Sequence, residues 1–168
     1  MQELKALIND IPDFPKPGIL FRDVTPLLRN RFDATIDVME ELFTEVEWAA
    51  VAAVAGIESR GFILAAALAE RRHKGFVAIR KKGKLPPPVV DVSYDLEYGS
   101  GVLEMQTGSG GLLLIDDVLA TGGTLGASVA LSRQAGYSLV GIGVLLDIGI
   151  APGFRCGEFV PRSVRQYG

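Results

Sequence analysis

The chain has 168 residues, of which 48% are hydrophobic and 22% are charged, with a formal net charge of -3. A chain of this length can bury roughly 70% of its unfolded surface in one core, so we expect one domain over residues 1–168. The acidic balance, with a pI near 5.2, argues against nucleic acid as a partner. We find no leader pattern and no run of about 20 apolar residues, and therefore expect a cytoplasmic protein without a membrane partner.

The N-terminal part of the chain predicts short elements followed by one longer helix. Residues 2–9 can form a short helix, whereas the proline-rich run 11–18 cannot, because proline lacks a backbone N–H and restricts the residue before it. Apolar residues then recur at spacings of four and three, which is typical of one face of an amphipathic helix: Phe32, Ile36, Met39, Phe43 and Val46. We therefore expect a helix that carries this face over residues 32–46.

Residues 49–84 predict a strand, a loop, a helix and a second strand. The small apolar run 49–55 ends at Gly56-Ile-Glu-Ser-Arg-Gly61, and helical character returns from Phe62 to Arg72. The short apolar segment 76–79 predicts a buried strand, which leads into Arg80-Lys-Lys-Gly-Lys84, called the basic turn below.

The C-terminal half continues this alternation. Residues 89–106 predict two extended pieces, and residues 112–115 are apolar without alternation, which indicates a strand buried on both faces. Residues 125–135 predict a helix with Gly136 as its C-cap, and residues 139–146 predict the next buried strand. We expect residues 150–168 to be irregular, with one strand. Strands that alternate with helices indicate an α/β fold with a central, mostly parallel sheet and ligand sites at its carboxyl edge.

The clearest functional signal follows the strand 112–115. Asp116 and Asp117 should mark where this strand emerges at the carboxyl edge of the sheet, and their carboxylates can accept hydrogen bonds from the vicinal hydroxyls of a sugar. The next five residues, called the phosphate loop below, combine little side-chain bulk, two hydroxyls and a helix N-terminus, which together suit a phosphate dianion. The predicted ribose-5-phosphate site is Asp116, Asp117, Ala120, Thr121, Gly122, Gly123 and Thr124. The alternative is that the aspartates merely end a strand and the glycines merely turn the chain.

Residues 112–124 contain neither a P-loop nor a Gly-x-Gly-x-x-Gly pattern. They resemble instead the phosphoribosyl-diphosphate signature of the type I phosphoribosyltransferases. Residues 56–62 are similar to the pyrophosphate loop in the adenine branch of that family, which implies that Ser59 and Arg60 bind pyrophosphate and that Arg60 acts in catalysis. Considered alone, Arg60 could equally be a surface residue paired with Glu58 or Glu70.

Three further segments carry the same resemblance. The stretch around the basic turn resembles the diphosphate-binding segment of the family, which implies pyrophosphate-binding roles for Arg80, Lys81 and Lys84; a charge run alone would usually be a solvated turn. Residues 93–99 match the catalytic flap, which assigns proton handling near the purine to Glu97 and packing by the diphosphate to Tyr98; alone they would be a half-exposed strand. The start of the chain resembles the part of the family that binds the base. The base-binding residues implied are Leu20, Phe21, Arg22 and Ile148.

The resemblance implies the type I phosphoribosyltransferase fold, with a flap hairpin and a small base-binding hood. It implies transfer of the 5-phosphoribosyl group from 5-phosphoribosyl 1-diphosphate (PRPP) to adenine, giving AMP and pyrophosphate in purine salvage. Mg²⁺ would bind through PRPP, with no metal held directly by the protein, and the protein would be a homodimer. The segment Pro86-Pro-Pro88, the segment 89–91 and the chain from Ile150 onward depart from the family pattern.

Two alternatives remain open from the sequence. The first is a phosphoribosyltransferase for hypoxanthine, guanine or xanthine, whose related enzymes resemble one another in a lysine that donates to O6. Residues 139–154 contain no Lys or Arg, although Asp147 could accept from the 2-amino group of guanine or simply end a strand. The second is a PRPP-sensing regulator, which would need a DNA-binding module that we do not find. The single histidine, His73, stands in a basic stretch and is expected to be solvated, and Cys156 is the single cysteine, so no internal disulfide can form.

Overall fold

The structure is a computed structural model that describes residues 2–96 and 99–167. The chain forms two compact units, residues 1–38 and 39–168. That residues 1–168 make up one domain stays a prediction. Among the residues described, no helix is long and apolar enough to cross a membrane.

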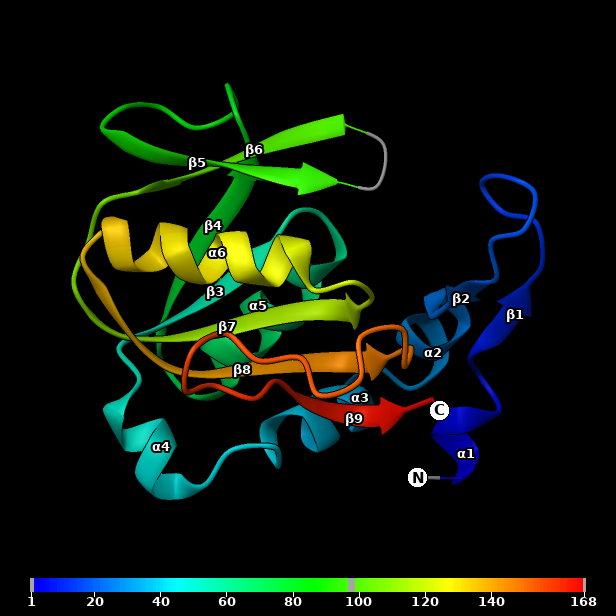
Figure 1. The fold of residues 1–168 in the computed structure, drawn as a ribbon. Helices are drawn as coiled ribbons and strands as arrows, with labels where there is room; N and C mark the ends of the chain where they lie inside the picture. Colours follow the sequence, from blue (N-terminus) through cyan, green and yellow to red (C-terminus); the bar gives the residue numbers. More distant parts are fainter. Residues whose placement is uncertain (1, 97–98, 168) are drawn as a thin grey trace. The chain divides into compact units, whose positions relative to one another are not determined.

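The first unit is built on a small antiparallel ladder, drawn in blue in Figure 1. In this ladder Ile11 lies opposite Phe21, and in the connecting loop Asp13 Oδ1 accepts a hydrogen bond from the Gly18 N–H at 2.7 Å. The helix predicted over residues 2–9 is correct only as far as Lys5, because residues 9–11 pair as a strand. The elements that begin in this unit are α1 (Gln2–Lys5), β1 (Asn9–Ile11), β2 (Phe21–Asp23), α2 (Thr25–Asn30) and α3 (Phe32–Glu40).

The single helix predicted over residues 32–46 is wrong, because α3 ends at Glu40. Thr44 starts a new helix with a capping box, in which its side chain accepts from the Glu47 N–H and the Glu47 carboxylate accepts from the Thr44 N–H. Val46 is 82% exposed in that second helix, so it does not belong to the apolar face. The apolar spacing of three and four residues continues across Thr44, although the backbone begins a new helix there.

The second unit is a seven-stranded sheet in the order β5-β6-β4-β3-β7-β8-β9 (Figure 1). The five strands from β4 to β9 in this order run parallel, and the flap hairpin, which we define as β5 and β6, joins antiparallel to β4. The predicted α/β class is therefore confirmed. The elements are α4 (Glu45–Ala50), β3 (Ala53–Ile57), α5 (Arg60–Arg71), β4 (Gly75–Lys81), β5 (Val89–Leu96), β6 (Gly99–Gln106), β7 (Gly110–Leu119), α6 (Gly123–Gln134), β8 (Tyr137–Asp147) and β9 (Arg162–Gln166).

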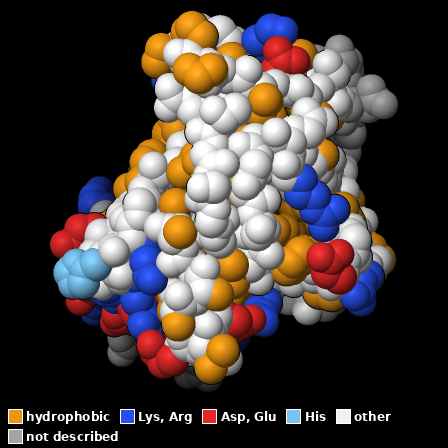
Figure 2. All heavy atoms as spheres, turned by 90° about the vertical axis from the view of Figure 1, so that its left-hand side faces the viewer, with side chains coloured by type: hydrophobic (Ala, Val, Ile, Leu, Met, Phe, Trp, Pro, Cys, Tyr) orange, Lys and Arg blue, Asp and Glu red, His pale blue; other side chains and the backbone are white. Residues whose placement is uncertain are grey.

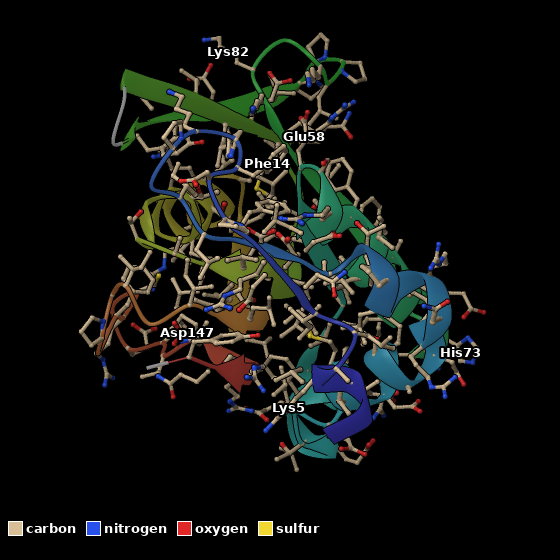
Figure 3. The ribbon with its side chains drawn as sticks, turned by 90° about the vertical axis from the view of Figure 1, so that its right-hand side faces the viewer. Lys5, Phe14, Glu58, His73, Lys82 and Asp147 are labelled. Carbon is tan, nitrogen blue, oxygen red and sulfur yellow. The ribbon has the colours of Figure 1, made fainter. Side chains whose placement is uncertain are left out.

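Helices α5 and α6 cover opposite faces of this sheet (Figures 1 and 3). On β7, Leu112 and Leu114 belong to the core cluster that includes residues of α6, whereas Leu113 and Ile115 alternate with them on the other face, and all four are fully buried. Burial on both faces explains why this strand has an apolar run without alternation, as predicted.

Strand β7 is longer than the sequence suggested, because it continues to Leu119. Asp116 and Asp117 therefore lie inside the strand near its carboxyl end and not beyond it. They stay in the ladder because Asp116 pairs in register with Val144 of β8.

The first turn of α5 approaches β7 so closely that only glycine fits at residue 61. A Cβ there would lie 2.9 Å from Asp116 Oδ1 and 3.0 Å from the Ile115 carbonyl oxygen. By contrast, a Cβ on Gly126 in α6 would meet nothing within 4 Å.

We expect Gly61→Ala to lower the free energy of unfolding by about 1–3 kcal/mol, because the added methyl forces α5 away from β7. The matched variant Gly126→Ala should instead raise it by about 0.5–1 kcal/mol through helix propensity. Urea denaturation of both variants measures the difference. Equal shifts in the two variants would contradict the close packing at Gly61.

Glu47 links the start of α4 to the last strand. Arg162 of β9 donates to Glu47 Oε2 at 2.9 Å and to the Leu42 carbonyl oxygen at 2.6 Å. The hydrogen bonds from Arg162, together with the Thr44 N–H, lower the pKa of Glu47 to about 2.

A carboxyl whose pKa is lowered in the folded state stabilises the fold above its ordinary pKa of 4.5, and this contribution is lost as the pH falls through about 2. We expect Glu47→Gln to cost about 1 kcal/mol at pH 7, because the site is solvent-screened, and to flatten the loss of stability between these two pH values. Thermal melts from pH 2 to 7 test this, with the exposed residue Glu41→Gln as control. A wild-type acid profile retained by Glu47→Gln would refute the assignment.

Candidate active site

The two predicted anion-binding loops leave the same edge of the sheet from neighbouring strands. Strand β3 ends at Ile57 and pairs in parallel with β7, with Gly56 opposite Ile115. The carboxyl ends of parallel strands meet at one edge, so the chain after β3 and the chain after β7 emerge side by side. The sequence prediction that both loops serve one site is consistent with this register.

The phosphate loop encloses a cavity of about 80 Å³. Its lining contains most of the predicted ribose-5-phosphate residues and adds three apolar ones: Asp116, Val118, Leu119, Ala120, Thr121, Gly122, Thr124 and Leu125. Gly122 has φ +87°, a left-handed conformation that glycine adopts without strain. Of the predicted residues, Asp117 and Gly123 are absent from this lining, and Gly123 begins α6.

The N-terminus of α6 supplies the donors expected for a phosphate. The Gly126 N–H makes a helical bond to the Gly122 carbonyl oxygen at 2.8 Å. Helix geometry leaves the preceding N–H groups, those of Gly123, Thr124 and Leu125, without a helical partner. Because the positive end of the helix dipole lies here as well, the loop is a favourable place for an anion.

Asp116 and Asp117 are each 8% exposed, but different groups contact their carboxylates. Asp116 Oδ1 accepts from the Asp117 N–H at 2.9 Å, whereas Arg60 Nη2 lies 2.6 Å from Asp117 Oδ2. Burial, and then the charge of Asp117, raise the pKa of Asp116 well above its ordinary value. The ionised form of Asp116 is therefore disfavoured beside Asp117, and hydroxyl donors or a cation next to the pair would stabilise it.

The contact between Arg60 and Asp117 joins the pyrophosphate loop, residues 56–61, to the ribose site. Arg60 is the first residue of α5, and its guanidinium pairs with Asp117 across the two loops. Asp117 Oδ2 is buried and, despite the short distance, makes no hydrogen bond of good angle, so it can accept one more donor. Ser59 is exposed at the N-cap of α5 without a capping bond from its hydroxyl, which stays available to a ligand.

The basic turn is tied to the pyrophosphate loop through Glu58 (Figure 3). Glu58 pairs with Lys84 Nζ, lies 3.4 Å from Arg80 Nε and accepts from the Lys81 N–H at 3.1 Å. The hydrogen bond from Lys84 is the main reason why the pKa of Glu58 is lowered. The structure thus brings Arg80 and Lys84 together, while Lys81 follows Arg80 in β4 and so points its exposed side chain to the other face.

The flap hairpin is confirmed as a pair of strands, but its predicted catalytic residues, Glu97 and Tyr98, lie outside the described residues. Tyr94 of β5 lies opposite Gly101 of β6, and its ring covers that glycine: a Cβ on Gly101 would lie 2.7 Å from Tyr94 Cε1. The Tyr94 ring therefore packs on the hairpin ladder two pairs before its last described pair, Leu96 with Gly99.

The residues implied for the base fall in both units of the chain. Leu20 is 48% exposed, Phe21 packs its ring edge-on against Phe14 at 5.1 Å, and Arg22 pairs with Asp10. In the other unit, the Ile148 N–H donates to the Leu119 carbonyl oxygen at 3.1 Å, directly before the phosphate loop.

Asp147 is held by the backbone and so has a structural role. Its carboxylate accepts from the Gly149 N–H at 2.9 Å and from Gln166 Nε2 at 3.3 Å, beside β9 (Figure 3). Each carboxylate oxygen of Asp147 thus already accepts one hydrogen bond from within the fold, as a strand-end residue would.

Sequence reasoning assigned no role to three residues that shape this site: Glu58, Glu104 and Phe154. Glu58 stands inside the motif Gly56-Ile-Glu-Ser-Arg-Gly61, and its position directly before Ser59 and Arg60 is the sequence feature that could have indicated its role. Glu104 interrupts the apolar residues 103 and 105 of a strand, which is a weaker signal. Phe154 gave none, yet its ring lies against the phosphate loop, because a Cβ on Gly122 would be 2.1 Å from Phe154 Cε2.

His73 and Cys156, for which no catalytic role was expected, do not belong to the site described above. His73 is exposed among charged side chains (Figure 2), and Cys156 is buried in the core cluster. Within residues 2–96 and 99–167, no group of three or more His, Cys, Asp or Glu side chains is arranged to hold a metal ion.

Comparisons with known proteins agree with this geometry. The phosphoribosyl transferase domain model matches residues 24–153. Adenine phosphoribosyltransferase of Bdellovibrio bacteriovorus is 53% identical over 165 residues, covering 98% of this chain and 99% of the relative. The crystal structure of adenine phosphoribosyltransferase from Rhodothermus marinus shares 40% identity with a TM-score of 0.85, over 98% of this chain and 97% of that one. APRTase from Giardia lamblia, complexed with 9-deazaadenine, shares 37% identity with a TM-score of 0.87, over 99% and 97% of the two chains. The chain belongs to the adenine phosphoribosyltransferase family.

Proposed function

We propose that the protein transfers the 5-phosphoribosyl group of PRPP to adenine, forming AMP and pyrophosphate in purine salvage. The observation that supports this most directly is the pairing of Arg60 with Asp117, because it joins the loop after β3 to the carboxyl end of β7. PRPP carries a phosphate at one end and a diphosphate at the other. Such a substrate fits two anion-binding loops with carboxylates between them that accept hydrogen bonds from the ribose hydroxyls.

The phosphate loop would anchor the 5-phosphate of PRPP. Its helical N–H groups and the hydroxyls of Thr121 and Thr124 donate to phosphate oxygens, and Asp116 and Asp117 accept from the ribose hydroxyls. This binding energy lies away from the bond that breaks and serves to align the ribose.

The pyrophosphate loop and the basic turn would neutralise the leaving group. As the glycosidic bond loosens, negative charge grows on the diphosphate, and Ser59, Arg60, Arg80 and Lys84 provide donors and positive charge for it. Lys81 would add charge from the opposite face of β4. Because the ribose C1 becomes cationic, catalysis consists mainly of holding both partners in line.

Glu97 and Tyr98, which follow β5 in the sequence, would close over the substrates. Glu97 would handle the proton of the purine, and Tyr98 would pack by the diphosphate and keep water from the cationic ribose. The continuous pairing of β5 with β6 from Val89 to Leu96 supports this proposal, because it brings the chain on both sides of these two residues into one hairpin.

We propose that Mg²⁺ enters with PRPP. Magnesium keeps several waters and binds through substrate phosphates, and the one buried oxygen of Asp117 with room for a donor fits a hydrated or substrate-bound ion better than a cage of protein ligands. Bound there, the ion would neutralise diphosphate charge.

Adenine is the base we propose, held by Phe21 through stacking, by the backbone at Leu20 and Arg22, and by Ile148. The 6-amino group of adenine needs acceptors, which backbone carbonyls supply. The occupied carboxylate of Asp147 and the lack of Lys or Arg over residues 139–154 both favour adenine over 6-oxopurines.

We further propose a cytoplasmic homodimer. Ile63 of α5 and Phe76 of β4 are 46% and 44% exposed, and Phe62 packs edge-on against Phe76 at 5.9 Å. Apolar side chains of this size on neighbouring elements suit contact with a second copy of the chain. The single cysteine is compatible with a reducing compartment.

Asp117→Asn should reduce kcat/KM for PRPP about ten- to a hundredfold, because it weakens acceptance from a buried ribose hydroxyl and the pairing with Arg60. Steady-state kinetics beside a thermal melt test this, with the exposed Asp33→Asn of α3 as control. Normal kinetics in a folded Asp117→Asn enzyme would remove Asp117 from the site.

The function itself is tested by offering each purine together with PRPP and Mg²⁺. We expect kcat/KM for adenine to exceed that for hypoxanthine or guanine by at least about a hundredfold, since an O6 without a donor leaves a polar group unpaired. Product analysis by chromatography identifies the nucleotide. Comparable rates with hypoxanthine would favour the 6-oxopurine alternative instead.

A further inference from the structure

Glu104 is a buried carboxylate that the proposed mechanism leaves without a role. It is 3% exposed, and among the described residues the other acidic side chains buried to this degree are Asp116 and Asp117 of the ribose site. Burial of a carboxylate is costly unless donors satisfy it, so its surroundings indicate what it holds in place.

The donors to Glu104 all come from the basic turn and the residue after it. Glu104 Oε1 accepts from the Lys84 N–H at 2.6 Å and from the Leu85 N–H at 2.7 Å. Donation from the backbone of Gly83, then of Lys84 and Leu85, lowers the pKa of Glu104 in spite of its burial. The carboxylate is thus ionised, and the N–H groups of one short stretch of backbone donate hydrogen bonds to it.

Glu104 also occupies the point where three strands meet. On β6 it lies opposite Arg80 of β4 and opposite Asp91 of β5. The side chain of Glu104 thus joins the basic turn to the stem of the flap hairpin. Lys82 adds two contacts to the same stem, from its N–H to the Val102 carbonyl oxygen at 3.0 Å and from its Nζ to Asp91 at 2.7 Å. After the turn, Gln106 Nε2 donates to the Pro86 carbonyl oxygen at 3.2 Å.

We propose that Glu104 is a positioning residue for the pyrophosphate site, which fixes the backbone of the basic turn so that Arg80 and Lys84 present their charges to the diphosphate. This inference rests on the proposed function, because it assigns the basic turn to the leaving group. It adds a residue that touches no substrate.

The contacts of Lys84 link the position of its backbone to the positions of the Arg80 and Lys84 side chains. Its N–H donates to Glu104, its carbonyl oxygen accepts from Arg80 Nη1 at 3.4 Å, and its Nζ pairs with Glu58. A shift of the Lys84 backbone would therefore displace both cations relative to the pyrophosphate loop.

The two possible effects of this carboxylate on an anion have opposite signs. If Glu104 acted only as a nearby negative charge, its removal would strengthen pyrophosphate binding. If it acts by fixing the turn, its removal weakens binding. The backbone donors already balance its charge, so we expect the positioning effect to dominate.

The experiment is to titrate Glu104→Gln with pyrophosphate in the presence of Mg²⁺ and, separately, with AMP, by calorimetry. The Kd for pyrophosphate should rise about tenfold, the effect of losing one charge-assisted hydrogen bond. AMP binding should change less than about twofold, because AMP uses the phosphate loop and the base site. Glu41→Gln, the same substitution at an exposed carboxylate remote in sequence from the turn, is the matched control and should leave both constants unchanged.

An unchanged or lowered Kd for pyrophosphate in Glu104→Gln would overturn the proposal, and so would equal weakening of pyrophosphate and AMP. If Glu104→Gln does not fold, Glu104→Asp, which keeps the charge but withdraws the oxygen from the turn, decides through the same titrations. A wild-type protein that bound neither ligand and made no AMP would count against the proposed function, whereas a wild type that binds both while the variant matches it counts against Glu104 alone.

Discussion

The parallel pairing of β3 with β7 is the constraint on which the arrangement of residues 39–168 depends. It places the pyrophosphate loop and the phosphate loop at one edge of the sheet, each leading into the N-terminus of a helix. Close packing makes this pairing specific, because Gly56 and Gly61 leave no room for a Cβ between α5 and the sheet. A rigid scaffold of this kind can hold flexible anions in line at little cost in entropy.

The site is organised by carboxylates as much as by cations. Glu58 holds the side chain of Lys84, Glu104 holds its backbone, and Asp117 holds Arg60. Each carboxylate keeps a positive group in a defined place before any substrate arrives, which is the preorganisation that electrostatic catalysis requires. The same contacts also link the flap hairpin, the basic turn and the pyrophosphate loop into one continuous network.

Burial gives the two aspartates of the ribose site their character. Asp116 lies close to Gly61 and to Asp117, and burial first and the charge of Asp117 second raise its pKa. Such a pair is unfavourable for stability alone, so its presence at the carboxyl edge is best understood as a provision for hydroxyl groups and a cation.

Local pattern was enough to predict much of this protein. The sequence by itself determined the α/β class and the positions of several elements, because each of these depends on residues that are neighbours in the chain. They are the apolar run 112–115, the loop 120–124, the helix that begins near Arg60 and the hairpin 89–106. Periodicity misplaced the helix over 32–46, because a capping box at Thr44 outweighed the apolar spacing, and it ended β7 too early, because pairing with β8 keeps charged residues in the ladder. Only the tertiary structure decided that Arg60 meets Asp117, that Glu58 and Glu104 grip the basic turn and that Phe154 covers Gly122. These contacts join residues that are 20 or more positions apart in the sequence, and they follow from strand order and register, which no local pattern contains.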